Sequence, residues 1–156
     1  MHYAWGSVGF TLAQRTLTLE TLLAFDFGQK RIGIAVGQSV TGTASPLVTL
    51  AARQGQPDWG TLDHIITTWH PSALVVGLPC HLDGAEQKIT KEARRFAGDL
   101  QSRYGLPVHL VDERLTSDEA ERLINKQPRS NVRDVDQVAA QLILQDWFNQ
   151  REHSQS

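Results

Sequence analysis

The stretch from Thr21 to Gly37 constrains the fold most, because it predicts two strands joined by a tight turn. Its first half is the apolar run Leu22–Phe25, which ends at the charged residue Asp26. A buried strand has no reason to hold a carboxylate unless something binds it, because an unpaired buried charge is costly. Asp26 is therefore either a binding residue or the acceptor of a turn hydrogen bond, a role in which Asp is common.

The second half of this stretch alternates with a period of two, as a strand does. One face is bulky and the other is nearly bare, with Ile32, Ile34 and Val36 alternating with Gly33, Ala35 and Gly37. A bare strand face beside a carboxylate is a platform for a large polar substrate or a metal ion. Gly28 stands where the chain turns or lets a ligand approach the backbone, and we expect such an approach at Gly28 and Gly33.

The length and composition indicate one soluble domain. The chain has 156 residues, of which 40% are hydrophobic and 21% charged, enough for a single core. A net charge of −2 excludes a global basic field, so any nucleic-acid binding must come from local patches. The single cysteine, Cys80, excludes an internal disulfide and fits a reducing cytoplasm. No apolar run reaches membrane-spanning length.

The domain is expected over residues 21–150, after an extension at 1–20 that we expect to be poorly ordered and before a polar tail at 151–156. Hydrophobic periodicity and turn residues predict the elements that follow the first two strands. These are a strand at 44–50 with Pro46 at a sheet edge, a polar loop at 53–57, a helix at 62–69, a strand at 73–78, a helix at 86–104, a strand at 107–111, a short helix at 116–126, a loop at 125–133 and a helix at 134–150. This order predicts an α/β fold, a mixed sheet with helices on its faces.

Three carboxylates stand where α/β proteins usually build chemistry. Asp26 is in the first strand, Glu113 follows the last strand beside Asp112, and Asp136 is in the first turn of the last helix. They could converge at the carboxyl ends of the central strands. Oxygen ligands without His or Cys suit Mg²⁺ or Mn²⁺, and such a cluster suits two-metal hydrolysis of a phosphodiester. Alternatively, Asp136 stabilises the helix dipole, and Asp112 and Glu113 pair with Arg114.

Five motifs in this order closely resemble the YqgF family. They span Leu22 to Phe148 and read D-F-G-Q-K-R-I-G-I-A-V, T-G-T-A-S-P-L, V-V-G-L-P-x-x-x-D-G-x-E, D-E-R-L-T-S-D-E-A and V-D-Q-V-A-A-Q-L-I-L-Q-D-W-F. The family comprises Holliday-junction-resolvase-like proteins of RNase H-like fold, also described as pre-16S rRNA nucleases. The resemblance implies a five-stranded mixed sheet flanked by helices on both faces, and the family's motif glycines fall on Gly28, Gly33 and Gly77.

The resemblance also implies a hydrolase that cleaves structured nucleic acid with Mg²⁺ or Mn²⁺. The family's catalytic and metal-binding acids fall on Asp26, Glu113 and Asp136. The implied role is maturation of the 5′ end of 16S rRNA in the cytoplasm, with ribosomal particles as possible partners and no membrane.

The second acid is open to a competitor. In the RNase H-like strand order, the neighbour of the first strand is 73–78, which ends at Pro79 without an acid. Glu113 is one strand further out, about 10 Å away, so it must reach inward or bind through water. Asp83 is the alternative ligand, although an Asp-Gly pair is first a turn former. We favour Glu113.

Local groups of cations provide the expected substrate contacts. Lys30 and Arg31 flank the first acid, where they suit a phosphate. The loop at 125–133 holds Lys126, Arg129 and Arg133 and no acid, so it is the preferred substrate-contact loop. A further run reads as a solvated helix face, namely Lys88, Lys91, Arg94, Arg95 and Arg103.

Three other functions remain open from the sequence. A resolvase of branched DNA should be a two-fold dimer, because it cuts two symmetric strands, so both monomer and homodimer are possible. A non-catalytic RNA-binding factor for ribosome assembly or transcription could keep the fold. A sugar-kinase-like or actin-like ATPase also begins with D-x-G, but it needs two such domains and this chain has room for one.

Overall fold

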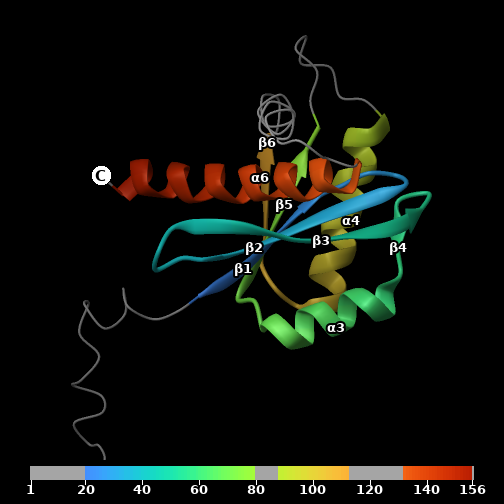
Figure 1. Cartoon of the computed structure of the whole chain (residues 1–156), viewed down its shortest axis with the longest axis horizontal. Helices are drawn as coiled ribbons and strands as arrows, with labels where there is room; N and C mark the ends of the chain where they lie inside the picture. The colour runs from blue at the N-terminus through green and yellow to red at the C-terminus, as the bar shows by residue number, and fades with distance from the viewer. Residues whose placement is uncertain (1–19, 80–87, 113–131, 156) are drawn as a thin grey trace, which may run out of the picture.

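The computed structural model describes residues 20–79, 88–112 and 132–155, which form one mixed sheet with helices packed against it (Figure 1). Alternating or continuous apolar runs form the strands, and apolar residues at helical spacing form the buried sides of the helices. No helix in this part of the chain is long and apolar enough to cross a membrane. In chain order the elements are β1 (Thr21–Asp26), β2 (Arg31–Gln38), β3 (Thr43–Arg53), β4 (Gln56–Pro57), α3 (Trp59–Trp69), β5 (Ala73–Leu78), α4 (Lys88–Tyr104), β6 (Val108–Asp112) and α6 (Val132–Gln155).

The sheet has six strands in the order β4-β3-β2-β1-β5-β6. The first four strands pair antiparallel, whereas β1, β5 and β6 run parallel. The predicted mixed sheet is therefore confirmed, with β5 beside β1 and β6 one strand further out. β1 is central, and its last residue, Asp26, lies between Gly33 of β2 and Gly77 of β5 in the register.

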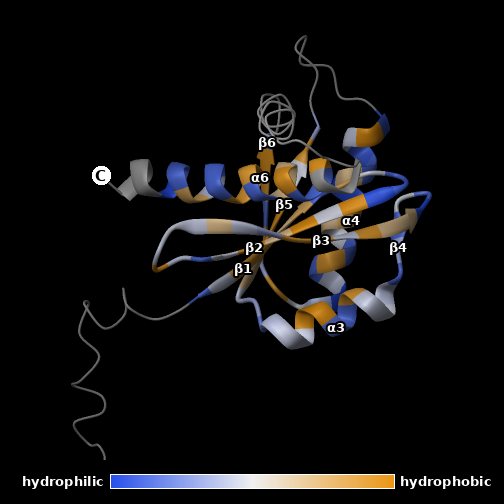
Figure 2. Cartoon of the chain, in the orientation of Figure 1, coloured by the Kyte–Doolittle hydropathy of each residue, from blue (hydrophilic) through white to orange (hydrophobic). Residues whose placement is uncertain are grey.

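Helices cover both faces of the sheet, as predicted. In β1, Leu23 and Phe25 belong to the core cluster that includes residues of α3 and α4, whereas Leu22 and Ala24 belong to the cluster that includes residues of α6. All four side chains are essentially inaccessible to solvent. Figure 2 shows the apolar strands between α6 on one side and α3 on the other. A strand buried on both faces accounts for the continuous apolar run of the sequence.

The strand count differs from the prediction because residues 53–57 form a hairpin rather than a polar loop. Arg53 pairs with Gln56, and the two residues between them, Gln54 and Gly55, have φ of 52° and 80°. Positive φ at both central positions is the geometry of a type I′ turn, which suits the twist of a two-residue hairpin. The Gln-Gly pair lacks the Asn or Asp that usually signals this turn, so the sequence did not predict β4.

The helices also differ from prediction at their ends. α6 begins at Val132, so Arg133 lies inside the helix and not in the preceding loop. The helix continues to Gln155, so the expected polar tail from 151 is mostly helical. α4 ends at Tyr104 as predicted, and the positive φ of Gly105 (65°) suits a helix stop. The predicted helix at 116–126, residues 1–19 and most of the loop at 125–133 lie outside the described residues.

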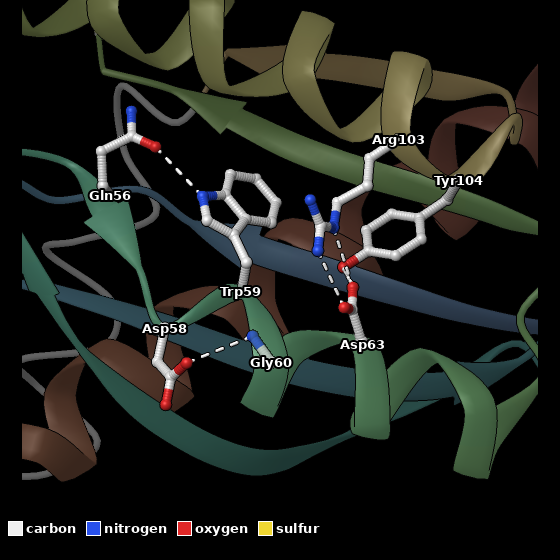
Figure 3. A network of polar contacts seen from close by, with 7 residues as sticks. All are labelled: Gln56, Asp58, Trp59, Gly60, Asp63, Arg103 and Tyr104. Carbon is white, nitrogen blue, oxygen red and sulfur yellow. Dashed lines mark hydrogen bonds and ion pairs between the residues drawn. The ribbon is translucent and has the colours of Figure 1, made fainter.

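A polar network joins α3 to α4 (Figure 3). Arg103 donates from Nε and Nη2 to the two carboxylate oxygens of Asp63 at 2.8 Å, and the Tyr104 hydroxyl donates to Oδ1 at 2.7 Å. The Arg103 guanidinium also lies 5.1 Å from the ring centroid of Trp59. Arg103 is therefore an ion-pair residue and not only part of a solvated face. These bonds, that of Arg103 above all, lower the pKa of Asp63 from 3.8 to about 2.

This network predicts a pH dependence of stability. Because the pKa of Asp63 is lower in the folded protein, its ionised form stabilises the fold above about pH 4, and this contribution is lost as the pH falls towards 2. Asp63→Asn should lower the melting temperature at pH 7, and the difference from the unmodified protein should close between pH 4 and 2. The effect should be small because both partners are 44% exposed.

Thermal unfolding followed by circular dichroism between pH 2 and 7 measures this difference. The double variant Asp63→Asn/Arg103→Gln serves as the control, since it has no ion pair to lose. If the single variant and the unmodified protein keep a constant difference over this range, the lowered pKa of Asp63 is wrong.

Candidate active site

Asp26 stands at the carboxyl end of the central strand. It is half-buried, and the alternation of β1 puts it on the same face as Leu22 and Ala24, which pack with residues of α6. Its neighbours in the register are glycines on both sides, Gly33 and Gly77. The strand thus presents a carboxylate at its end between two residues that have no side chains to cover it.

Helix α6 packs on the bare face of β2, so this face is not an open platform for a ligand. A Cβ atom at Gly33 would collide with the backbone carbonyl of Asp136, and one at Gly37 would lie 2.8 Å from Cδ2 of Leu144. The helix backbone therefore lies directly on the strand at Gly33, whereas helix side chains fill the space over Gly37. We expected a ligand to approach the backbone at Gly33, and the group that lies there is the protein's own helix.

The packing of α6 on β2 brings Asp136 to the side of the sheet that carries Asp26. The Asp136 backbone lies over Gly33, and Gly33 is the register partner of Asp26. Two of the three predicted acids thus share one face at the carboxyl end of β1. Asp136 is the fifth residue of α6, just beyond the predicted first turn, because the helix begins earlier than expected.

Arg31 holds the carboxylate of Asp136. Its Nε donates to Oδ2 at 2.9 Å, and the side chains are 41% and 19% exposed, respectively. A partly buried ion pair of this kind fixes the orientation of both groups. Arg31 was predicted to contact a phosphate, and the contact that the structure shows is with the carboxylate of Asp136.

The turn between β1 and β2 depends on Gly28 for its geometry. A Cβ atom there would lie 2.5 Å from the carbonyl oxygen of Arg31, so no side chain fits. The turn brings Lys30 to the surface, where its side chain is exposed. The Gln29 amide donates to Glu92 of α4 at 2.6 Å, which ties the turn to the opposite helix layer.

The remaining predicted site residues lie outside the described part of the chain or at its margin. Glu113, Asp83, Lys126 and Arg129 fall outside it, and Arg133 is the second residue of α6. Asp112 ends β6 beside Leu78 of β5, so the segment leading to Glu113 is two strands from Asp26, as expected. Among the described residues, no three acidic, His or Cys side chains are grouped closely enough to hold a metal ion.

The mixed sheet with helices on both faces and an acid at the end of its central strand defines an RNase H-like α/β protein. Comparison with solved structures supports this fold. The chain superposes on Thermus thermophilus RuvC in complex with a Holliday junction substrate with a TM-score of 0.52, covering 85% of this chain and 96% of that one at 14% identity. A second structure of the same protein gives a TM-score of 0.51.

Comparison of sequences identifies the family. The model for RuvX, described as a Holliday junction resolvase, matches residues 20–150. Curated relatives named "Putative pre-16S rRNA nuclease" include one from Legionella pneumophila, 50% identical over 133 residues, covering 83% of this chain and 96% of the relative. One from Nitrosococcus oceani is 51% identical over 133 residues, covering 84% and 88%. The chain belongs to the RuvX family, the YqgF family of the sequence analysis, and is a nuclease.

The contact between α6 and β2 can be tested at Gly33. Gly33→Ala should destabilise the protein by about 2–4 kcal/mol, because the new methyl group meets the backbone of Asp136 and forces the helix away. The variant should also lose nuclease activity at temperatures where it remains folded, since Asp136 moves with the helix. Urea unfolding and a cleavage assay on the folded variant measure the two effects.

Gly98→Ala is the matched control. Gly98 is an exposed residue of α4 with nothing within 4 Å of its would-be Cβ, so alanine should stabilise the helix by about 0.5–1 kcal/mol. Equal stability of the Gly33→Ala variant and the unmodified protein would show that α6 does not rest on this strand.

Proposed function

We propose that this nuclease is a Mg²⁺- or Mn²⁺-dependent endonuclease that hydrolyses a phosphodiester bond in the maturation of the 5′ end of pre-16S rRNA. The observation that carries the proposal is the position of Asp136 over Gly33, the register partner of Asp26, on one face at the end of the central strand. The names of curated relatives that match nearly the whole chain support the substrate. Ribosomal particles in the cytoplasm are the expected partners.

The donors at this site fit a hard divalent cation. Asp26 and Asp136 offer carboxylate oxygens, which Mg²⁺ and Mn²⁺ prefer over nitrogen or sulfur. Glu113 is the proposed third ligand, and Asp83 is its alternative. When bound, the metal would supply an activated water as nucleophile and stabilise charge on the leaving oxygen.

The chain's own residues position this chemistry. Arg31 orients the Asp136 carboxylate through the 2.9 Å bond from Nε, a supporting contact of the kind that tunes metal ligands. Contact between α6 and Gly33 fixes the distance between the two acids. Lys30 is exposed beside them and is proposed to bind a phosphate, together with Lys126, Arg129 and Arg133.

The roles of the proposed acids can be tested by replacing each carboxylate with the amide of the same shape. Asp26→Asn should lower the cleavage rate at least about 100-fold while the fold survives, because the change removes a ligand charge but keeps the shape. Asp136→Asn should have a similar effect, and Glu113→Gln should behave like them. Cleavage of precursor rRNA with Mg²⁺, Mn²⁺ or EDTA measures the rate, and circular dichroism measures folding.

The Asp83→Asn variant is the control, and it should cleave normally. If Asp83→Asn is inactive and Glu113→Gln is active, the third ligand is Asp83 and not Glu113. If Asp26→Asn cleaves at a near-normal rate with either metal, the active site lies elsewhere.

Resolution of branched DNA is the second candidate, since the matching family model is described as a Holliday junction resolvase. A four-way DNA junction assayed beside the precursor rRNA separates the two candidates. Symmetric cuts in the junction by a dimer, with intact rRNA, would replace the proposed substrate.

A further inference from the structure

We propose that the β3–β4 hairpin is a second nucleic-acid contact of this nuclease, in which Arg53 binds a backbone phosphate of the strand that is cut at Asp26 and Asp136. The inference rests on the proposed active site, and it adds a binding residue that neither the sequence motifs nor the comparisons assign.

The register of the sheet places Arg53 on the face of the proposed active site. Gly33 pairs with Thr49 and Arg31 pairs with Ala51, so the alternation of β3 puts residue 53 on the same face. This is the face on which Arg31 meets Asp136. Figure 1 shows the β3–β4 hairpin at the same end of the sheet as the first residues of α6.

The strip of β3 that leads to Arg53 is accessible. Ala51 and Arg53 are exposed and Thr49 is half-buried, so α6 does not cover this end of the strand. The small side chain of Ala51 stands beside Arg31 in the register and leaves room for a polynucleotide backbone. Counting strand spacings and residues, the Cα atom of Arg53 is about 16 Å from that of Asp26, a few nucleotides away.

The hairpin is fixed to the segment that follows Asp26. The Ala52 amide donates to the carbonyl of Lys30 at 2.8 Å, and the Gly55 amide donates to the carbonyl of Gln29 at 2.9 Å. Gly55 also packs on Phe27, whose Cζ would lie 2.8 Å from a Cβ at that position. Arg53 is therefore held at a defined distance from Asp26, as a contact that sets the register of a substrate requires.

The charge of Arg53 is available to a ligand. In the described part of the chain, neither Arg53 nor the nearby Lys30 has an ion-pair partner. Two carboxylates of neighbouring elements are engaged elsewhere, because Glu92 accepts from Gln29 and Asp58 caps α3. An exposed guanidinium on a rigid hairpin suits a phosphate, which it binds with two parallel hydrogen bonds.

The test measures binding without cleavage. Labelled precursor rRNA and a labelled four-way DNA junction are titrated with protein in EDTA at several salt concentrations. Loss of one phosphate contact should reduce the log–log salt slope of Arg53→Gln by about 0.7–0.9. The affinity advantage of the unmodified protein should therefore shrink about threefold between 50 and 200 mM salt. Arg53→Lys should restore the slope, because it restores the charge.

Arg95→Gln is the matched control. Arg95 is an exposed arginine of α4, whose helix packs on the opposite face of the sheet, and it too has no ion-pair partner among the described residues. Its loss should leave the salt slope unchanged. Steady-state cleavage adds a second measurement, in which Arg53→Gln should raise KM and leave kcat unchanged.

The outcomes separate this inference from the proposed function. If the unmodified protein cleaves rRNA but Arg53→Gln keeps its salt slope, or Arg95→Gln loses as much, the hairpin contact is wrong and the function stands. If Arg53→Gln flattens the slope while the unmodified protein cleaves neither substrate, the contact stands and the function is wrong. The nucleic acid on which the slope changes identifies the bound substrate.

Discussion

The direct contact of the α6 backbone with the glycine face of β2 is the constraint on which the site depends. Helices normally rest on a sheet through interdigitating side chains, and here Gly33 lets the helix backbone itself meet the strand, while Gly37 makes room for helix side chains. The closeness has two consequences. It buries Leu144 and Phe148 against the strand, and it places Asp136 over Gly33, the register partner of Asp26. Stability and site geometry therefore come from the same packing, and the glycines cannot be changed for one without affecting the other.

This closeness creates an electrostatic problem that Arg31 relieves. Asp26 and Asp136 lie on one face of the sheet, so their negative charges repel each other. A guanidinium bonded to Asp136 at 2.9 Å offsets part of that repulsion while no metal is bound. Arg31 is also the first residue of β2, so the strand whose glycines seat the helix also supplies the cation. The exposed fraction of Arg31, 41%, leaves its guanidinium accessible to a phosphate that approaches the acids.

Much of this structure could be predicted from local sequence patterns, and the exceptions have physical reasons. The continuous apolar run at 73–78 forms β5 as predicted, because a short strand covered on both faces is apolar throughout. The glycine face of β2 was expected to receive a ligand, and it is occupied by α6, because a strand pattern cannot distinguish a ligand from a helix that lies far along the chain. Arg31 and Asp136 are 105 positions apart in the sequence, so no local sequence pattern predicts their ion pair. The sequence does not predict the hairpin, because Gln54 adopts a positive φ that residues with a side chain rarely favour. Backbone hydrogen bonds from Ala52 and Gly55 to the neighbouring turn stabilise this conformation.

A chain with a net charge of −2 that acts on a polyanion must confine its attraction to a small area. Screening at physiological salt weakens the effect of each exposed charge beyond about 8 Å, so cations on the face of the acids offset the repulsion of the substrate more than distant ones do. The turn that follows Asp26 meets this need, since it carries Lys30 and Arg31 and is bonded to the hairpin that carries Arg53. Three cations on two connected turns surround one end of the sheet, whereas Arg103, on the helix layer of the other face, is neutralised by Asp63. Arg95 on the other face also lacks an ion-pair partner among the described residues, so position on the face of the acids, and not pairing, distinguishes Lys30, Arg31 and Arg53 as the proposed substrate contacts.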